Sequence, residues 1–458
     1  MHDAQVIIVG AGFAGLTAAN ALVDAGVTVV VLEARDRVDG RVHAGQLAGH
    51  TIDLGGMWVS SAQPRVWALL QRHRLETYET PLAGSGSVTL DRRQQRVPGE
   101  DFDRALGVVD RLRLLQVARA VDAAAAKVEP GRPWQAPGAR SLDALTVAAW
   151  IETQTGSRAV RSVFDAICKS VFCVEARELS FLFFLFYCRS GGGLEALLTS
   201  TNGGAQHHLV HGGLHRVAAL EAARLGPRLH LDEAVHGISQ RDGLVTVHTG
   251  RASRTCRRVV LAAPPPLSAR ITFDPPLSAL KRSLVERQRM GSCIKAWLAY
   301  PEPFWRRDGL NGFVIDEHEA FSPVFDATPP GDGPGLVAGF FEAEHALGLS
   351  GQPVEARRAL ALTVLTRHLG DGARGPLDYV EHDWVADAWA TGCYGATLGP
   401  GVLTTAGHTI REAHGAVHFA GTETASEWSG YVEGAIASGE RVAAEVRAAI
   451  DAARSLGR

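Results

Sequence analysis

Cysteine is scarce in this chain, and none of it forms a close pair. Six cysteines occur among 458 residues, and no two have the C-x-x-C spacing of zinc and redox sites. A secreted scaffold held by disulfides is therefore not indicated, and reduced thiols in a cytoplasmic protein are expected. The six are Cys168, Cys173, Cys188, Cys256, Cys293 and Cys393.

Long apolar runs are missing as well. The longest, LSFLFFLFY at residues 179–187, is far shorter than the roughly 18–20 residues that a helix needs to cross a bilayer. The N-terminus leads almost directly into a strand pattern without a secretory signal, and the C-terminal pattern is a polar Ala/Glu/Arg helix. We therefore expect no membrane attachment and a cytoplasmic location.

An excess of one charge is also lacking. Lys and Arg number 46 and Asp and Glu 49, which gives a net charge of −3. Neither nucleic acid nor an anionic membrane is therefore favoured as a partner. The sequence has no internal repeat and no low-complexity tail, and its length predicts two or three domains.

Glycine, in contrast, is abundant, and its 50 residues gather in short clusters. The first cluster, GAGFAG, follows a buried-strand pattern at 5–9 and opens a helical run that ends at Gly26. A second apolar strand pattern follows at 27–33. This β–turn–α–β unit predicts the start of a parallel sheet.

Three of these glycines, Gly10, Gly12 and Gly15, form the G-x-G-x-x-G pattern of dinucleotide sites. Gly10 permits the tight turn, Gly12 lets backbone approach a pyrophosphate, and Gly15 lets helix and strand pack closely. The N–H groups at the start of the helix attract phosphate. Glu33, 18 residues after Gly15, can accept both ribose hydroxyls of an adenosine. The unit predicts dinucleotide binding but does not separate NAD from FAD.

Three further segments carry a resemblance to a known family. EARDRVDGRVHAG (33–45) resembles the E-A-R-D-R-x-G-G-R segment of amine-oxidase flavoproteins, and IDLGGMWV (52–59) continues it. VHFAGTETASEWSGYVEGAIASGERVAAEV (417–446) resembles the C-terminal cofactor motif of monoamine oxidases. The chain departs at Asp39, where the family usually has glycine. A carboxylate beside a pyrophosphate is unfavourable unless it turns outward or pairs with Arg41.

The resemblance to flavin-containing amine oxidases covers nearly all of the chain and implies a mixed α/β fold (α+β mixed). A Rossmann-type FAD-binding domain would be assembled from separated segments, with a substrate domain of mixed sheet and helices interleaved. The expected boundaries are 1–80, 205–285 and 390–458 for the FAD-binding domain, and 81–204 and 286–389 for the substrate-binding domain.

The resemblance implies FAD as the cofactor and assigns residues to each part of it. The N–H of Val432, at the start of a helix, would stabilise negative charge at flavin O2. The other residues placed against FAD are Arg35 and Arg41 at the phosphates, Val235 at the adenine, Gly55 and Gly56 beside the flavin ring, and Gly421, Thr422 and Glu423 near the phosphate and ribityl chain.

Four residues would surround the reacting part of the flavin in the family's pattern. Tyr431 of SGYVEG and Tyr394 of GCYG would face each other and hold the amine between their rings. Cys393 would join the flavin 8α-methyl group as a thioether, and the alternative is a free thiol. Lys295 would hold a water that is bridged to flavin N5.

The stretch STNGGAQHHLVHGG at 200–213 resembles the lining of the family's substrate cavity. Gln206 would supply a polar contact there, and Leu198, Phe172 and Cys173 would be apolar walls. His207, His208 and His211 are not interpreted as a metal site, because no carboxylate or cysteine has suitable spacing. No G-x-S-x-G sequence supports a serine hydrolase.

The implied reaction is FAD-dependent oxidation of a primary or secondary amine to an imine, then an aldehyde and ammonia, with release of H₂O₂. Apolar or aromatic monoamines are the preferred substrates, and the expected partners are the small-molecule amine and O₂, with a homodimer left open. No residue is identified as a general base, so the amine would bind in its neutral form. The alternatives are a polyamine or L-amino-acid oxidase, a dehydrogenase, and a non-catalytic FAD-binding protein.

Overall fold

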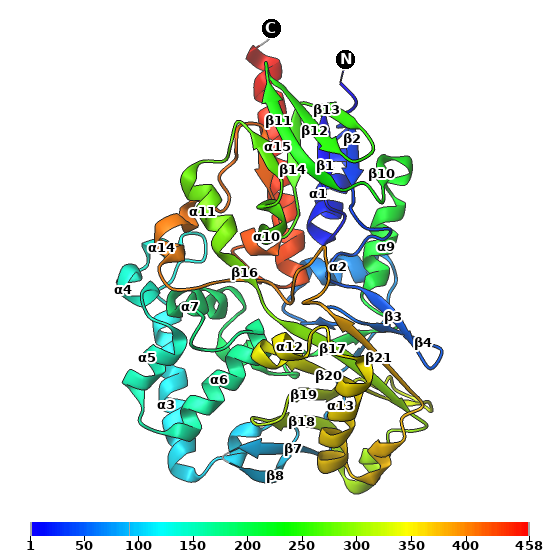
Figure 1. Ribbon diagram of the computed structural model, residues 1–458, viewed down its shortest axis with the longest axis vertical. Helices are drawn as coiled ribbons and strands as arrows, with labels where there is room; N and C mark the ends of the chain where they lie inside the picture. Colours follow the sequence, from blue (N-terminus) through cyan, green and yellow to red (C-terminus); the bar gives the residue numbers. More distant parts are fainter. Residues whose placement is uncertain (1, 91, 457–458) are drawn as a thin grey trace.

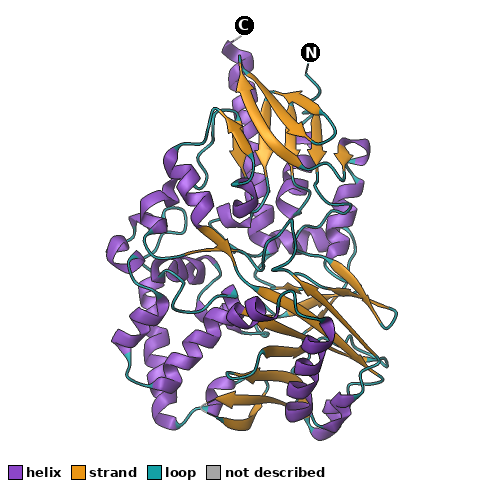
Figure 2. Cartoon of the chain, in the orientation of Figure 1, coloured by secondary structure: helices purple, strands orange, loops and turns teal. Residues whose placement is uncertain are grey.

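The computed structural model describes residues 2–90 and 92–456. Figure 1 shows a parallel sheet and the long C-terminal helix at one end of the molecule, near both termini, and a large mixed sheet at the other. A group of helices lies beside the mixed sheet (Figure 2). The expectation of a mixed α/β fold is confirmed.

The parallel sheet has five strands in the order β10-β2-β1-β14-β23. Its central strand is VIIV, which is buried on both faces, as strands of parallel sheets between helices usually are. Helix α1 (Phe13–Asp24) packs against α15 (Val432–Leu456), the last helix of the chain. The strands are β1 (Val6–Val9), β2 (Val29–Leu32), β10 (Leu229–His230), β14 (Arg258–Leu261) and β23 (Val417–Phe419).

The mixed sheet has seven strands in the order β21-β17-β20-β19-β18-β7-β8, of which only the β18–β7 pair is parallel. Helix α13 (Val354–Leu369) contacts β18 and β19. The strands are β7 (Ser85–Leu90), β8 (Arg93–Pro98), β17 (Cys293–Tyr300), β18 (Leu310–Asp316), β19 (Phe321–Asp326), β20 (Gly335–Glu342) and β21 (Asp378–Asp383).

The longest apolar run of the sequence becomes α7 (Phe181–Ser190), whose residues are buried except Arg189. It packs among α3 (Val108–Ala125), α6 (Arg158–Phe172) and other helices in the largest apolar cluster. The run is thus a core helix, and within the described part of the chain no helix is long and apolar enough to span a membrane.

Strands β11 (Val235–Arg241) and β12 (Leu244–Thr249) pair antiparallel across Asp242 and Gly243. The remaining strands are β3 (Ala44–Leu47), β4 (His50–Asp53), β5 (Trp58–Val59), β6 (Thr77–Glu79), β9 (His208–Val210), β13 (Ser253–Cys256), β15 (Thr272–Asp274), β16 (Gln288–Met290) and β22 (Ala396–Leu398). The remaining helices are α2 (Pro64–Arg72), α4 (Ala139–Asp143), α5 (Val147–Gln154), α8 (Leu194–Leu198), α9 (His215–Ala223), α10 (Pro265–Ser268), α11 (Ala279–Arg287), α12 (Ala343–Leu349) and α14 (Val402–Ala406).

Candidate active site

One cavity of about 750 Å³ gathers most of the residues that the sequence singled out. Its wall includes residues from the glycine loop, the end of β2, β17, the 393–394 loop and the start of α15. The expected site residues that line it are Gly10, Gly12, Glu33, Arg35, Arg41, Gly55, Gly56, Leu198, Gln206, Val235, Lys295, Cys393, Tyr394, Gly421, Thr422, Tyr431 and Val432.

The glycine loop forms a cradle that fits a dinucleotide. Gly10 has a φ of +102°, and a Cβ on Gly15 would lie 1.9 Å from the Gly10 carbonyl oxygen, so Gly15 has no room for a side chain. A Cβ on Gly12 would instead approach only the Cα of Gly40, at 3.9 Å. Helix α1 has no side chain capping its N-terminus, so its first N–H groups remain for a phosphate.

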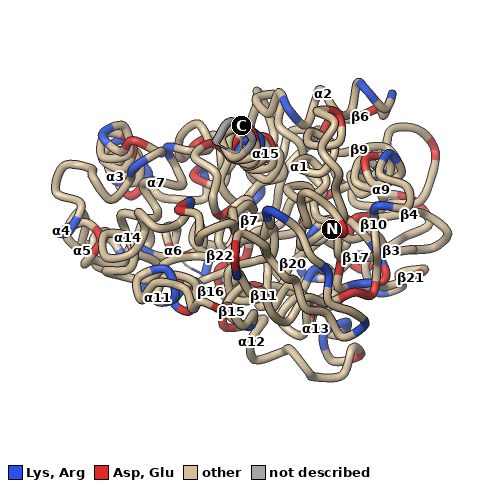
Figure 3. Tube along the Cα trace, turned by 90° about the horizontal axis from the view of Figure 1, so that it is seen from above, with Lys and Arg blue, Asp and Glu red and all other residues tan. Residues whose placement is uncertain are grey.

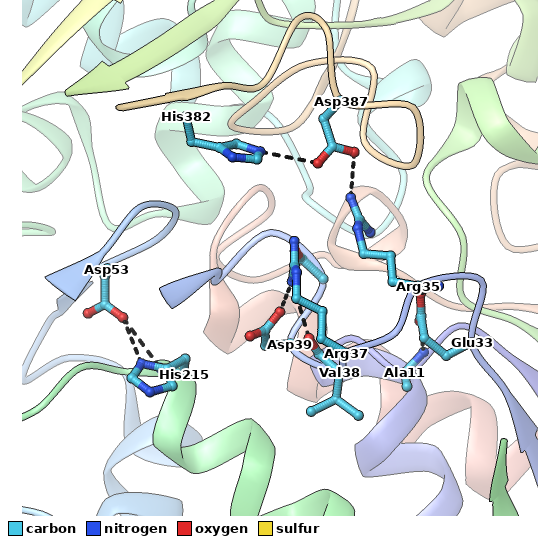
Figure 4. A network of polar contacts seen from close by, with 11 residues as sticks. Ala11, Glu33, Arg35, Arg37, Val38, Asp39, Asp53, His215, His382 and Asp387 are labelled. Atoms are coloured by element: carbon cyan, nitrogen blue, oxygen red, sulfur yellow. Dashed lines mark hydrogen bonds and ion pairs between the residues drawn. The ribbon is translucent and has the colours of Figure 1, made fainter. Parts of the chain in front are cut away.

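Glu33 ties this loop to the next one. One carboxylate oxygen accepts from the N–H of Ala11 at 2.7 Å, and the other accepts from the N–H of Arg35 at 3.0 Å (Figure 4). The side chain therefore stands at the edge of the cradle in a fixed orientation, where the remaining acceptor capacity of a carboxylate can meet ribose hydroxyls.

Both arginines expected at the phosphates have carboxylate partners. Arg35 donates to Asp387 at 2.6 Å, and Asp387 also contacts His382 at 3.2 Å (Figure 4). Arg41 donates to Glu423 at 2.7 Å and to the carbonyl oxygen of Tyr394 at 2.8 Å. Glu423 does not line the cavity, and its placement is that of a support for Arg41.

Asp39, which departs from the family pattern, is buried and lines the cavity. It pairs with Arg37 rather than with Arg41 (Figure 4). Its backbone has a φ of +82°, a conformation that favours glycine. Burial, opposed by Arg37, raises the pKa of the carboxyl to about 7. Arg37 was not among the expected partners of Asp39.

Lys295 is fully enclosed in β17, with an exposed fraction of 2%. Its ammonium donates to the carbonyl oxygens of Asp53 and Gly55, both at 2.8 Å, and contacts the sulfur of Met57 at 3.0 Å. Burial lowers the pKa of Lys295 to about 8. A lysine on the cavity wall therefore changes charge close to neutral pH.

The two tyrosines approach the cavity from different clusters. Tyr394 meets the ring of Phe340 edge-on, with centroids 6.0 Å apart. Tyr431 packs against Tyr187 and Trp428, at 6.0 and 5.1 Å between centroids. Both rings line the one cavity, and aromatic faces in such a place can hold an amine.

The Tyr394 hydroxyl donates to Oε1 of Glu342 at 3.1 Å. Glu342 lies at the end of β20 and lines the cavity, although it was not among the expected site residues. Its only signal is a carboxylate that ends the apolar run GLVAGFF, a position that many surface residues share.

Cys393 lines the cavity beneath Tyr394 and packs in a small cluster with two other thiols, Cys173 and Cys293. Burial raises the pKa of the Cys393 thiol, and Cys293 adds to the rise, whereas Arg41 and Lys295 oppose it. The N–H of Cys393 donates to the carbonyl oxygen of Gly291 at 2.8 Å, which holds the loop against the start of β17.

Phe172 and Cys173, expected as cavity walls, are not brought to the cavity surface. Phe172 packs behind it against Tyr187, at 4.5 Å between centroids, and Cys173 is wholly buried. Gln206 does line the cavity, and its Oε1 has no protein partner. The same holds for Nε1 of Trp58, and both of these unpartnered atoms are buried.

The histidine segment acquires a carboxylate that its sequence spacing did not reveal. Glu79 of β6 pairs across the sheet with His208 of β9, and the candidate ligand atoms of Glu79, His207 and His208 lie within 4.8 Å of one another. His211 is not part of this group and packs on Tyr78 instead.

Comparisons with known proteins agree with this architecture. The family model described as flavin containing amine oxidoreductase matches residues 13–447. AofH of Mycobacterium tuberculosis, itself only provisionally assigned as a flavin-containing monoamine oxidase, is 36% identical over 97% of this chain and 96% of its own length. Flavin-containing amine oxidase A of Canis lupus familiaris is 33% identical over 97% of this chain and 85% of its own.

Two solved structures extend the likeness to the fold. Wild-type putrescine oxidase bound to putrescine has a TM-score of 0.93 and 31% identity, covering 97% of this chain and 99% of its own. Cyclohexylamine oxidase from Brevibacterium oxydans has a TM-score of 0.92 and 31% identity, covering 98% and 100%.

The glycine cradle lies on a parallel sheet, and the cavity beside it is lined by a buried lysine and two tyrosines. This arrangement is typical of a dinucleotide-dependent oxidoreductase. The chain belongs to the family of flavin-containing amine oxidoreductases. It is a flavin-dependent, monoamine oxidase-like enzyme, and the cofactor of its family is FAD.

Proposed function

We propose that this enzyme oxidises primary amines, and some secondary amines, to imines that hydrolyse to aldehydes and ammonia, with release of H₂O₂. Bound FAD would take up the two electrons and pass them to O₂. The observation that carries the proposal is the shared cavity, in which Lys295, Tyr394 and Tyr431 line the same space as the glycine cradle.

The chain's own residues would then bind and orient the amine. The rings of Tyr394 and Tyr431 supply aromatic faces, and the side chain of Gln206 belongs to the same cavity wall. Lys295, held by two carbonyl oxygens, would position a water at the flavin. The apolar residues of the wall, among them Leu198 and Phe340, favour apolar or aromatic monoamines.

A panel of amines tests this proposal. Each amine is added without oxygen to the FAD-loaded enzyme, and the loss of flavin absorbance is followed; oxygen is then admitted and H₂O₂ is measured. Benzylamine and alkylamines are expected to bleach the flavin. Bleaching without H₂O₂ would indicate a dehydrogenase, and a flavin that no amine or amino acid bleaches would contradict the proposal.

A diamine is the second candidate substrate. The buried carboxylate of Glu342 lines the cavity, and a carboxylate can pair with a second ammonium group. Putrescine in the same panel distinguishes this candidate, because a diamine specialist reacts with putrescine far faster than with benzylamine.

We also propose that Cys393 carries FAD covalently, as a thioether to the flavin. The placement of its thiol in the cavity wall supports this. After acid precipitation, yellow colour is expected in the pellet of the natural protein and in the supernatant of a Cys393→Ala variant. Colour that leaves entirely with the supernatant in both would refute the bond.

The proposed division into domains follows the sheets. An FAD-binding domain of 1–80, 205–285 and 390–458 contains every strand of the parallel sheet, and a substrate domain of 81–204 and 286–389 contains every strand of the mixed sheet. The cavity draws on both sets of segments, which supports a site at their junction.

A further inference from the structure

The cavity wall contains a carboxylate whose surroundings differ from those of its neighbours. Glu342 is 3% exposed, and its Oε1 accepts the Tyr394 hydroxyl at 3.1 Å. The hydroxyl of Ser170, on α6, also favours the ionised form of this carboxyl. Both hydroxyl groups are neutral.

Several other carboxylates of the same wall pair with cations. Asp165 lies 2.9 Å from Lys169, and Glu233 lies 3.0 Å from Arg254. The further pairs are Asp39 with Arg37 and Glu319 with Arg367. Lys169 acts on Glu342 at longer range, but its ammonium is already shared between Asp165 and Glu175.

The groups that face Glu342 leave it able to take up a proton near neutral pH. Burial raises the pKa of its carboxyl to about 8, against the smaller opposing effects of Tyr394, Lys169 and Ser170. Burial raises the pKa of the Cys173 and Cys393 thiols, so both stay neutral in this range. A base whose pKa lies near the working pH is the most effective kind.

The proposed reaction needs such a group. An alkylamine with a pKa of about 10.4 is neutral in only about one molecule in a thousand at pH 7.4. Oxidation at the α-carbon requires the nitrogen lone pair, which the ammonium form lacks. Either the enzyme waits for the rare neutral amine, or a residue removes the proton after binding.

We propose that Glu342 removes this proton, through the hydroxyl of Tyr394. An ammonium N–H bond breaks as its hydrogen moves to the Tyr394 oxygen, and the Tyr394 hydroxyl hydrogen moves to Oε1 of Glu342. The products are a neutral amine and a neutral carboxylic acid; no electrons are transferred, and the acid returns its proton to water after turnover. The proposal rests on the amine oxidation proposed above.

The test measures flavin reduction by para-substituted benzylamines of different pKa, without oxygen, from pH 6.5 to 10. In the natural enzyme the rate is expected to rise with an apparent pKa near 8. In Glu342→Gln the rate of flavin reduction should fall by about 100-fold at pH 7.5. The remaining rate should rise only as the pH approaches the pKa of each amine. The loss should be smallest for the least basic amine. Glu342→Asp, which keeps a carboxylate, should restore part of the rate.

Glu344→Gln is the matched control, because Glu344 lies two residues further on, is exposed and pairs with Arg177. It should leave the pH profile unchanged. The flavin spectrum and melting temperature of each variant report whether it folds and holds FAD.

Three results would overturn the inference while leaving amine oxidation intact. These are an unchanged pH profile in Glu342→Gln, a loss that is the same for every amine pKa, and a loss confined to diamines, which would make Glu342 a binding group for a second ammonium. Failure of every amine to bleach the natural enzyme would instead overturn the proposed function and the inference together.

Discussion

Single residues in this protein depart from their usual behaviour where charge is buried. Lys295, Glu342 and Asp39 are each at least nine-tenths buried, and burial moves the pKa of each toward neutrality. Such shifts are typical of functional sites, and all three side chains line the one cavity.

The titration of Glu342 should change how the free energy of unfolding depends on pH. Its folded pKa, about 8, lies above that of an unfolded glutamate, so the folded state binds the extra proton between the two values. The contribution of Glu342 to the free energy of unfolding is therefore complete below about pH 4.3, and it is lost as the pH rises through 8. In thermal melts of the apo-protein, the melting temperature of Glu342→Gln should fall less between pH 5 and 8 than that of the natural protein. Equal falls in melting temperature would contradict the raised pKa.

Asp39 should make FAD binding weaken as the pH rises. Its carboxylate ionises near pH 7 beside the glycine cradle, where it repels a pyrophosphate. In a Cys393→Ala background, the FAD dissociation constant should increase from pH 6 to 8, and Asp39→Gly should flatten this dependence and bind FAD more tightly at pH 8. Titration by flavin fluorescence measures both. Asp36→Asn, at a nearby exposed carboxylate, should behave as the parent.

At the scale of elements, the junction before α15 is tightly constrained. Gly430 has a φ of +87°, and a Cβ there would lie 2.3 Å from the Tyr187 hydroxyl oxygen. The next residue is Tyr431, and the helix begins at Val432. A glycine here thus sets both the position of a tyrosine and the direction of a helix N-terminus.

Gly430→Ala should disturb both together. The substitution combines a positive φ with a side-chain clash, so we expect a loss of more than about 2 kcal/mol in stability and weaker retention of FAD on gel filtration. Gly26→Ala is the control, because Gly26 also has a positive φ, +75°, but no atom within 4 Å of the added Cβ. Equal losses in both variants would show that the clash with Tyr187 has no effect.

At the scale of the molecule, charge is dispersed and the site is assembled from distant segments. Acidic and basic residues are interspersed along the trace (Figure 3), consistent with the net charge of −3. The cavity wall takes residues from the first strand to the last helix, so a bound cofactor would connect segments that are separated by hundreds of residues. A homodimer stays a prediction.

Loss of FAD should therefore destabilise the whole chain. A ligand at a thousand times its dissociation constant stabilises by about 4 kcal/mol. Cys393→Ala protein stripped of FAD should melt several degrees lower than the same protein with FAD restored, in a scanning calorimeter. Equal melting temperatures would mean that FAD contributes little to holding the segments together.

Features that depend only on neighbours along the chain could be predicted from the amino-acid sequence. The glycine loop, Glu33 and the β–turn–α–β unit are local patterns, and each appears where it was expected. The apolar run at 179–187 was correctly separated from a membrane span, because length alone decides that question.

Contacts between side chains that are distant in the sequence follow from the tertiary structure and could not be predicted from local patterns. Glu342 reaches Tyr394 across 52 positions, and Glu79 meets His208 across a sheet. It also placed Phe172 and Cys173 behind the cavity wall rather than in it. Such contacts depend on the path of the backbone and on which face of an element is buried, and no local pattern specifies either for a single polar residue.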